Sequence, residues 1–217
     1  MLLIGQFDSP FVRRVGIALR YYGIRFDHAP FSVFRDAAEI ARYSPLRKAP
    51  TLVLDDGLVL VESSHCLDVI DRMASEADRL EGPGLLLPRA GPERTRGLSI
   101  CGFAMGAMEK SVSLVYEARL RDRAFAPWVE RCATQVGETL LLLERSYEQG
   151  AQPYPFGDRL SHADIAISCL LTFIDGAYPE VSDGLSIDGL RSVQRSLEAS
   201  ELFREISQPF EIPQPNG

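Results

Sequence analysis

The chain has 217 residues, 46% of them hydrophobic, and a net charge of −7 from 30 acidic and 23 basic side chains. This length allows one large or two small domains of an ordinary soluble protein. The negative charge argues against nucleic acid as a partner, because phosphate backbones need clustered Lys and Arg. The longest strongly apolar stretch, residues 165–174, is too short to cross a membrane, so we expect no membrane partner.

Strands and helices are expected to alternate over the first 80 residues. Residues 2–7 have a strand pattern, and residues 10–22 have apolar positions at helical spacing between Ser9, a natural N-cap, and Gly23. Residues 25–29 indicate a short strand and residues 34–43 a weaker helix that ends before Ser44-Pro45.

Residues 44–63 form the most informative stretch of the sequence. Ala49-Pro50 leads into an apolar strand over residues 51–54, and Asp56-Gly57 is a strong hairpin signal before a second strand at 58–61. Glu62-Ser63 then opens a helix, with Ser63 as the expected N-cap. The order β-α-β-α-β-β-α is thioredoxin-like.

The remainder of the chain is expected to be all-helical. Gly and Pro mark a linker at residues 81–92, followed by long helical patterns from Glu93 and Pro127 and a helix over 163–178 that is apolar nearly all round. Ser161 and Asp164 have the spacing of a capping box, for which we expect a structural role. We therefore predict domains at 1–80 and 93–217.

Three of these motifs, with the run from Gly157 to Ile165, make the chain resemble the glutathione transferase family. They are Ser9-Pro10-Phe11, Ala49-Pro50 and Glu62-Ser63, in the family's order and spacing. The resemblance implies an α/β thioredoxin-like domain that binds glutathione, followed by an all-α domain. It also implies a cytoplasmic detoxification enzyme that works as a homodimer, with the hairpin, the third helix and the long helix at the subunit interface.

The resemblance makes Ser9 the catalytic residue, donating a hydrogen bond to the sulfur of glutathione. The start of a helix and a bond to a charged partner together lower a thiol pKa by about 1–3 units. Branches of the family with reductase or dehydroascorbate activity have Cys here, and a hydroxyl cannot enter thiol–disulfide exchange. The alternative is that Ser9 only caps the helix.

Five further residues are expected to hold glutathione. A cis Ala49-Pro50 bond would present the Ala49 backbone to the cysteinyl unit, whereas a trans proline would only open an edge strand. Glu62 would accept from the γ-glutamyl ammonium, and Ser63 would bind its carboxylate at the helix start. Lys48 would reach the glycine carboxylate unless it is simply solvated.

A second set of residues is expected to line a pocket for a hydrophobic electrophile, although the same pattern is typical of plain core. The set comprises Phe11, Met105, Met108, Val112 and Tyr116, and Trp128 is a further candidate. Arg13, Arg14, Arg47 and Lys48 are candidates to steer an anionic substrate.

The expected reaction is conjugation of glutathione to an electrophile. The alternatives are a specialised glutathione-dependent dehalogenase or isomerase, or a non-catalytic transferase-like binding protein. No metal is expected, because the three histidines lack metal-site spacing, and the four scattered cysteines are expected to be reduced and buried.

Overall fold

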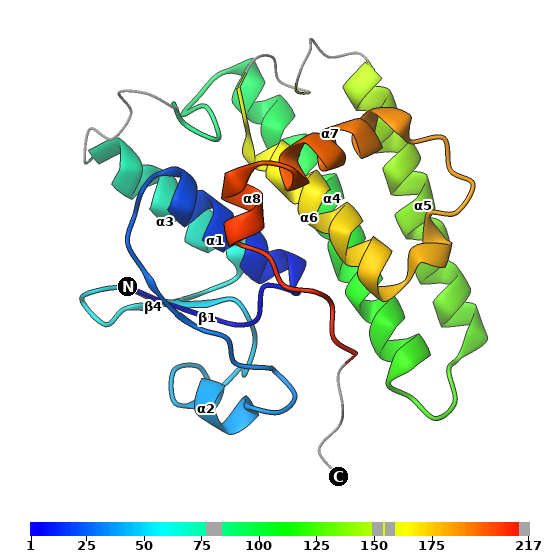
Figure 1. Ribbon diagram of the computed structural model, residues 1–217, viewed down its shortest axis with the longest axis horizontal. Helices are drawn as coiled ribbons and strands as arrows, with labels where there is room; N and C mark the ends of the chain where they lie inside the picture. The colour runs from blue at the N-terminus through cyan, green and yellow to red at the C-terminus, as the bar shows by residue number, and fades with distance from the viewer. Residues whose placement is uncertain (77–83, 149–153, 155–158, 213–217) are drawn as a thin grey trace. The chain divides into compact units, whose positions relative to one another are not determined.

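The structure is a computed structural model that describes residues 1–76, 84–148, 154 and 159–212 (Figure 1). The chain forms two compact units, each described here by itself. The first contains Met1–Leu86 together with Glu201–Pro209, and the second contains Leu87–Ser200 together with Phe210–Ile212.

The first unit is built on a four-stranded sheet in the order β2-β1-β3-β4. The strands are β1 (Leu2–Ile4), β2 (Asp27–Ala29), β3 (Thr51–Val53) and β4 (Val59–Val61). β1 pairs in parallel with β2 and antiparallel with β3, and β3 and β4 form the predicted antiparallel hairpin. Leu3 of β1 and Leu52 of β3 are paired on these adjacent strands, and both are fully buried.

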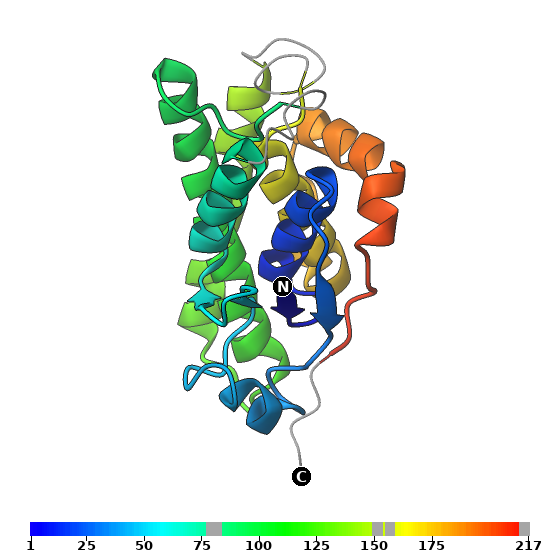
Figure 2. The ribbon, with the colours of Figure 1, turned by 90° about the vertical axis from the view of Figure 1, so that its left-hand side faces the viewer.

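Three helices complete the thioredoxin-like order, which confirms the predicted fold class of this unit. They are α1 (Pro10–Tyr21), α2 (Ala37–Ala41) and α3 (Ser63–Glu76). α1 and α3 lie side by side (Figure 2). Their apolar stripes are buried as the periodicity predicted, with Val15 and Ala18 on α1 and Cys66 and Ile70 on α3.

The segment Glu201–Pro209 belongs to this first unit, although the predicted helical domain spans residues 93–217. Helix α8 (Glu201–Glu205) packs on α1. Phe203 is fully buried, Ile206 nearly so, and Glu205 pairs with Arg20 of α1. The apolar side chains of this segment are buried through contacts with residues far away in the sequence, which local patterns do not reveal.

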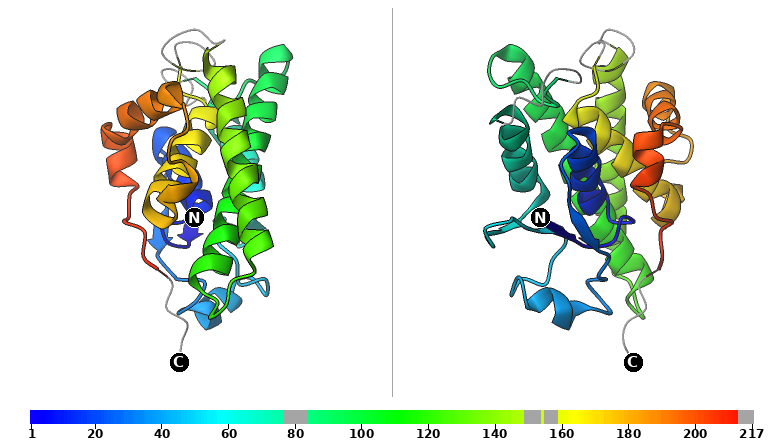
Figure 3. Two further views of the ribbon diagram at one scale, coloured as in Figure 1. Left: turned by 90° about the vertical axis from the view of Figure 1, so that its right-hand side faces the viewer. Right: turned by 60° about the vertical axis from the view of Figure 1, so that its left-hand side comes forward.

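The second unit is helical, as predicted. Its elements are α4 (Pro92–Arg119), α5 (Ala126–Glu148), α6 (His162–Ala177), the short 3-10 helix η1 (Pro179–Val181) and α7 (Asp188–Glu198). α4, α5 and α6 run alongside one another (Figure 3). Most of α6 is buried on every face, which explains why its sequence is apolar nearly all round.

Helix α4 is long and apolar enough to cross a membrane by length and composition alone. It packs instead against α5 and α6 and buries Ile100, Ala104, Met108 and Leu114. The core helix of a water-soluble bundle meets the same test of length and composition, and packing accounts for the buried part of the apolar content of α4.

All four cysteines are buried and free of disulfides, as predicted. The predicted loop over 149–156 and the Gly157-Asp158 part of the downstream motif lie outside the described residues, apart from Tyr154. The same holds for residues 81–83, the first part of the predicted linker 81–92.

Candidate functional site

Ser9 lies at the N-cap position of α1, with an extended backbone of φ −71° and ψ 121°. Its N–H donates to the Gln6 carbonyl (3.2 Å), and its carbonyl accepts from Arg13 N–H (2.9 Å). The side chain makes no capping hydrogen bond, so only the backbone of Ser9 serves as the cap. The half-buried hydroxyl is therefore available at the positive end of a 12-residue helix.

The Ala49-Pro50 peptide bond is cis, as predicted. This turn lies against the end of β1 at Gly5, where a Cβ atom would be 2.7 Å from Ala49 Cβ and 2.6 Å from Val12 Cγ2. Gly5 also has φ +128°, in the region that favours glycine. The absence of a side chain at Gly5 thus lets the turn and α1 approach the same strand end.

The junction between β4 and α3 corrects the predicted N-cap by one residue. Glu62 has φ 74°, and its carbonyl accepts from Cys66 N–H (3.1 Å), so Glu62 holds the cap position and Ser63 is the first helical residue. The Glu62 carboxylate accepts from Ser64 N–H (3.3 Å) and from the Ser63 hydroxyl (3.4 Å). A left-handed backbone at a non-glycine residue is strained and is often found at functional sites.

Arg14 of α1 is the residue of this site that the sequence analysis misassigned. It is only 2% exposed, so it cannot steer a substrate from the surface as predicted, and the same applies to Arg13 at 3%. The Arg14 guanidinium donates from Nη1 to the hydroxyls of Ser63 (3.2 Å) and Ser64 (3.4 Å). A charged residue on the buried stripe of α1 was the signal that could have identified it.

Arg14, Ser63, Ser64 and Glu62 thus form one hydrogen-bonded group at the start of α3. Ser64 was also missed, although the Ser63-Ser64 pair directly after Glu62 was visible in the sequence. The group combines a buried positive charge, the buried hydroxyl of Ser63, and the exposed hydroxyl and carboxylate of Ser64 and Glu62. Such an arrangement matches a ligand with adjacent carboxylate and ammonium groups.

Cys66 lies one turn into α3 from this group and is not a nucleophile. Burial, reinforced by the nearby Glu62 carboxylate, raises the pKa of its thiol to about 12. A thiol with such a pKa is almost entirely protonated at neutral pH.

The other predicted residues differ in accessibility. Lys48 is exposed beside the Ala49-Pro50 turn, and Phe11 is half-buried on α1. In the second unit, Met108 is fully buried, Val112 packs against Val115, and Tyr116 is 42% exposed. Full burial places Met108 in the core of the bundle, so it is the least suited of the predicted pocket residues.

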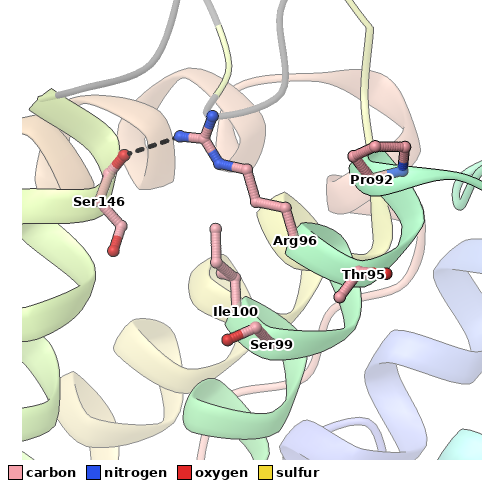
Figure 4. A pocket seen from close by; sticks show the side chains of 6 residues that line it. All are labelled: Pro92, Thr95, Arg96, Ser99, Ile100 and Ser146. Atoms are coloured by element: carbon pink, nitrogen blue, oxygen red, sulfur yellow. Dashed lines mark hydrogen bonds between the residues drawn. The ribbon is translucent and has the colours of Figure 1, made fainter.

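A separate hollow of about 610 Å³ lies at the start of α4 (Figure 4). Arg96 spans it and donates to the Ser146 carbonyl (3.4 Å). None of the predicted site residues lines this hollow, whose walls are Pro92, Thr95, Arg96, Ser99, Ile100 and Ser146.

The fold and this site define a class: a thioredoxin-like domain with a cis-proline turn, joined to a helical domain. Two family models match the chain. Residues 3–78 match the glutathione S-transferase N-terminal domain, and residues 126–199 match the C-terminal domain. Together they cover well over half of the chain, in the order of the two predicted domains, and the chain belongs to the glutathione S-transferase family.

Individual proteins agree with this assignment. The chain is 27% identical to the uncharacterized GST-like protein YibF of Escherichia coli K12, over 96% of this chain and 99% of that protein. A glutathione transferase family member from Pseudomonas fluorescens Pf-5, solved with bound S-(propanoic acid)-glutathione, has a TM-score of 0.78 and 25% identity, covering 97% of this chain and 98% of that one.

A Methylobacterium radiotolerans glutathione S-transferase, solved with glutathione sulfonate, is similar in fold. Its TM-score is 0.86 and its identity 24%, over 100% of this chain and 98% of that one. At this level of identity the likeness concerns the fold of the two chains.

Proposed function

We propose that this protein is a glutathione transferase that adds the thiolate of glutathione to a small hydrophobic electrophile. The observation that carries the proposal is the state of Ser9. Its hydroxyl lies at the start of α1, makes no capping bond, and follows a turn from the strand that contacts Ala49. A hydroxyl in this position can donate to a sulfur anion, which the helix start also stabilises.

The γ-glutamyl end of glutathione would bind at the start of α3. Without ligand, the Ser63 hydroxyl donates to Glu62 and accepts from Arg14. A hydroxyl has one proton to donate, so binding a carboxylate requires that proton to turn from Glu62 to the ligand. Glu62 is then released to accept from the ammonium group. The buried Arg14 charge favours the arriving carboxylate, and Ser64 offers a second, exposed hydroxyl.

The rest of the tripeptide would extend along the Ala49-Pro50 turn. The Ala49 backbone has no hydrogen bond to any other residue in the described ranges, so its N–H and C=O are open to the cysteinyl unit. Lys48 is exposed next to it and can meet the glycine carboxylate. In the reaction the thiol proton passes to water and a sulfur lone pair forms the new S–C bond. The bond that breaks at the attacked carbon gives its electron pair to the departing halide, to the epoxide oxygen, or through the double bond to the oxygen of an unsaturated carbonyl.

The electrophile site is proposed to use Met105, Val112 and Tyr116 of α4. These are the α4 members of the predicted set that retain exposed surface. A panel of aryl halides, epoxides and unsaturated carbonyls would distinguish conjugation from dehalogenation or ring opening, since each releases a different product.

The glutathione site is tested by removing the charge of Glu62. Glu62→Gln should weaken glutathione by about 1–3 kcal/mol, because the ammonium loses a charged partner. Glu39→Gln is the matched control, since Glu39 is a partly exposed carboxylate elsewhere in the same unit. Equal affinity in calorimetry for both variants and the wild type would refute the γ-glutamyl site.

The role of Ser9 is tested by Ser9→Ala. Glutathione affinity should stay nearly unchanged while turnover falls, because the lost bond matters mainly for the thiolate. The pKa of the bound thiol, followed by ultraviolet absorbance against pH, should rise. A constant thiol pKa would mean that another donor activates the sulfur.

A homodimer is also proposed, although fewer apolar side chains of α4 are exposed than the sequence suggested. Ile100, Met108 and Leu114 of α4 are buried within the chain, whereas Leu98 and Phe103 are 49% and 47% exposed. Exposed apolar side chains of this size favour a partner surface. Light scattering at micromolar concentration should give twice the 24.1 kDa chain mass, and Phe103→Glu should lower it. A monomer mass for the wild type would exclude the dimer.

A further inference from the structure

The turn that carries Ser9 is joined to the distant C-terminal segment through Gln208. Phe7 N–H donates to Gln208 Oε1 at 3.1 Å, across 201 positions of sequence. The turn itself closes through the bond from Ser9 N–H to the Gln6 carbonyl, so Phe7 is its second residue. A polar group withdrawn from water needs a partner, and the Gln208 side chain supplies one for this partly buried N–H.

Arg13 anchors the same segment to the first turn of α1. Its buried guanidinium donates from Nε to the Ile206 carbonyl (2.7 Å) and from Nη2 to the Phe203 carbonyl (3.1 Å). The guanidinium carbon also lies 5.7 Å from the centre of the Phe203 ring. Because Arg13 N–H bonds the Ser9 carbonyl, one residue links the catalytic serine to the end of α8.

Packing leaves the turn little freedom to shift. A Cβ atom on Gly16 of α1 would be 2.9 Å from both Ile206 Cγ2 and Phe7 Cε1, so these side chains lie directly against the helix backbone. On its other side the Phe7 ring stacks on His28 of β2, with ring centres 3.9 Å apart. His28 Nε2 in turn lies 2.8 Å from the Gly5 carbonyl, at the start of the same loop.

We infer that the C-terminal segment Phe203–Gln208 sets the position of the Ser9 hydroxyl, with Gln208 as the positioning residue. The inference rests on the proposed role of Ser9 in holding the glutathione thiolate. Gln208 touches Phe7, two residues before Ser9, and acts through the turn. A hydroxyl that activates a thiolate must be held to within about 0.5 Å, and a displacement of about 1 Å is costly. The hydrogen bond to Phe7 supplies that restraint at the second residue of the turn.

The main test replaces the acceptor while keeping the length of the side chain. Gln208→Met should lower kcat/KM about fivefold, the rate equivalent of one neutral hydrogen bond. The pKa of the bound glutathione thiol should rise, and the dissociation constant for glutathione should change less than twofold. Ser207→Ala, at the exposed neighbouring position, should change none of these quantities. Gln208→Asn, which draws the acceptor back by one methylene, should act in the same direction and provides a second variant with nearly native chemistry.

Combination with Ser9→Ala separates this inference from the proposed function. If Gln208 acts through Ser9, adding Gln208→Met to Ser9→Ala should leave the thiol pKa where Ser9→Ala alone places it. An unchanged thiol pKa in Gln208→Met and Gln208→Asn, together with a raised one in Ser9→Ala, would overturn the role of Gln208 and leave that of Ser9 intact. An unchanged thiol pKa in Ser9→Ala would overturn both.

Discussion

Helices α1 and α6 both have a serine at the N-cap position, and the two serines are used in different ways. Ser161 precedes α6 and closes a capping box: its hydroxyl accepts from Asp164 N–H, and the Asp164 side chain accepts from Ser161 N–H. Ser9 precedes α1, and its hydroxyl caps nothing. At the position equivalent to Asp164, α1 has Val12, a fully buried apolar side chain that cannot reciprocate.

The comparison indicates that the third residue after an N-cap serine decides how its hydroxyl is used. A polar residue there engages the hydroxyl in a capping box, whereas an apolar residue leaves the hydroxyl without that bond. Ser161 and Asp164 are both buried within the second unit, where unpaired polar groups are costly. Ser9 is half-buried at the end of a turn that β1, β2 and the C-terminal segment hold from several sides. The capping bonds make Ser161 a stabilising residue, whereas the Ser9 hydroxyl makes no such bond and is the one proposed to contact a ligand.

The largest expected effect on stability comes from adding a side chain at Gly5, where the Ala49-Pro50 turn and α1 approach the end of β1. Gly5→Ala should destabilise the protein by more than about 3 kcal/mol, because the added methyl meets Val12 and Ala49 in a backbone conformation that disfavours side chains. Gly23→Ala is the matched control: it has φ +62° with no atom within 4 Å of the new methyl, so it should cost only about 1 kcal/mol. Urea unfolding measures both, and equal costs would show that the close approach at Gly5 is unimportant.

The next largest effect is the pH dependence of stability caused by Asp164, the partner of Ser161 in the capping box. Burial raises the pKa of Asp164 to about 6, from 3.8, despite the hydrogen bonds from Ser161 that lower it. The folded state therefore binds a proton more tightly than the unfolded state, and stability from this group falls as pH rises from about 4 to about 6. The fall should be about 2–3 kcal/mol. Asp164→Asn should lack this slope, and an identical profile for variant and wild type between pH 4 and 7 would contradict it.

The smallest expected effect is the difference in stability between alanine variants of the two serines. Ser161→Ala should cost about 1 kcal/mol of stability through loss of the cap, whereas Ser9→Ala should change stability by less than about 0.5 kcal/mol. Thermal unfolding of the two variants tests the contrast. A loss of stability in Ser9→Ala as large as that in Ser161→Ala would make Ser9 an ordinary cap and remove the distinction.

The sequence predicted the elements better than their connections. The alternation up to Glu62, the hairpin at Asp56-Gly57 and the capping box at Ser161 are signals within a few residues of each other, and local hydrogen bonding explains each one. The predicted N-cap at Ser63 was wrong by one residue, because the left-handed backbone at Glu62 has no local signal in a non-glycine residue. Arg14 was read as a surface charge, since its burial depends on packing against α3.

By itself, the amino-acid sequence determined the thioredoxin-like order, the cis bond before Pro50 by family resemblance, and the candidates Ser9, Glu62 and Ser63. The tertiary structure alone decided which polar groups meet: Arg14 beneath Ser63 and Ser64, and Gln208 against Phe7. It also decided that the last helix packs on α1 in the first unit. The physical reason is that local patterns encode secondary structure, whereas contacts between residues 49 or 201 positions apart depend on how all the buried surfaces pack together.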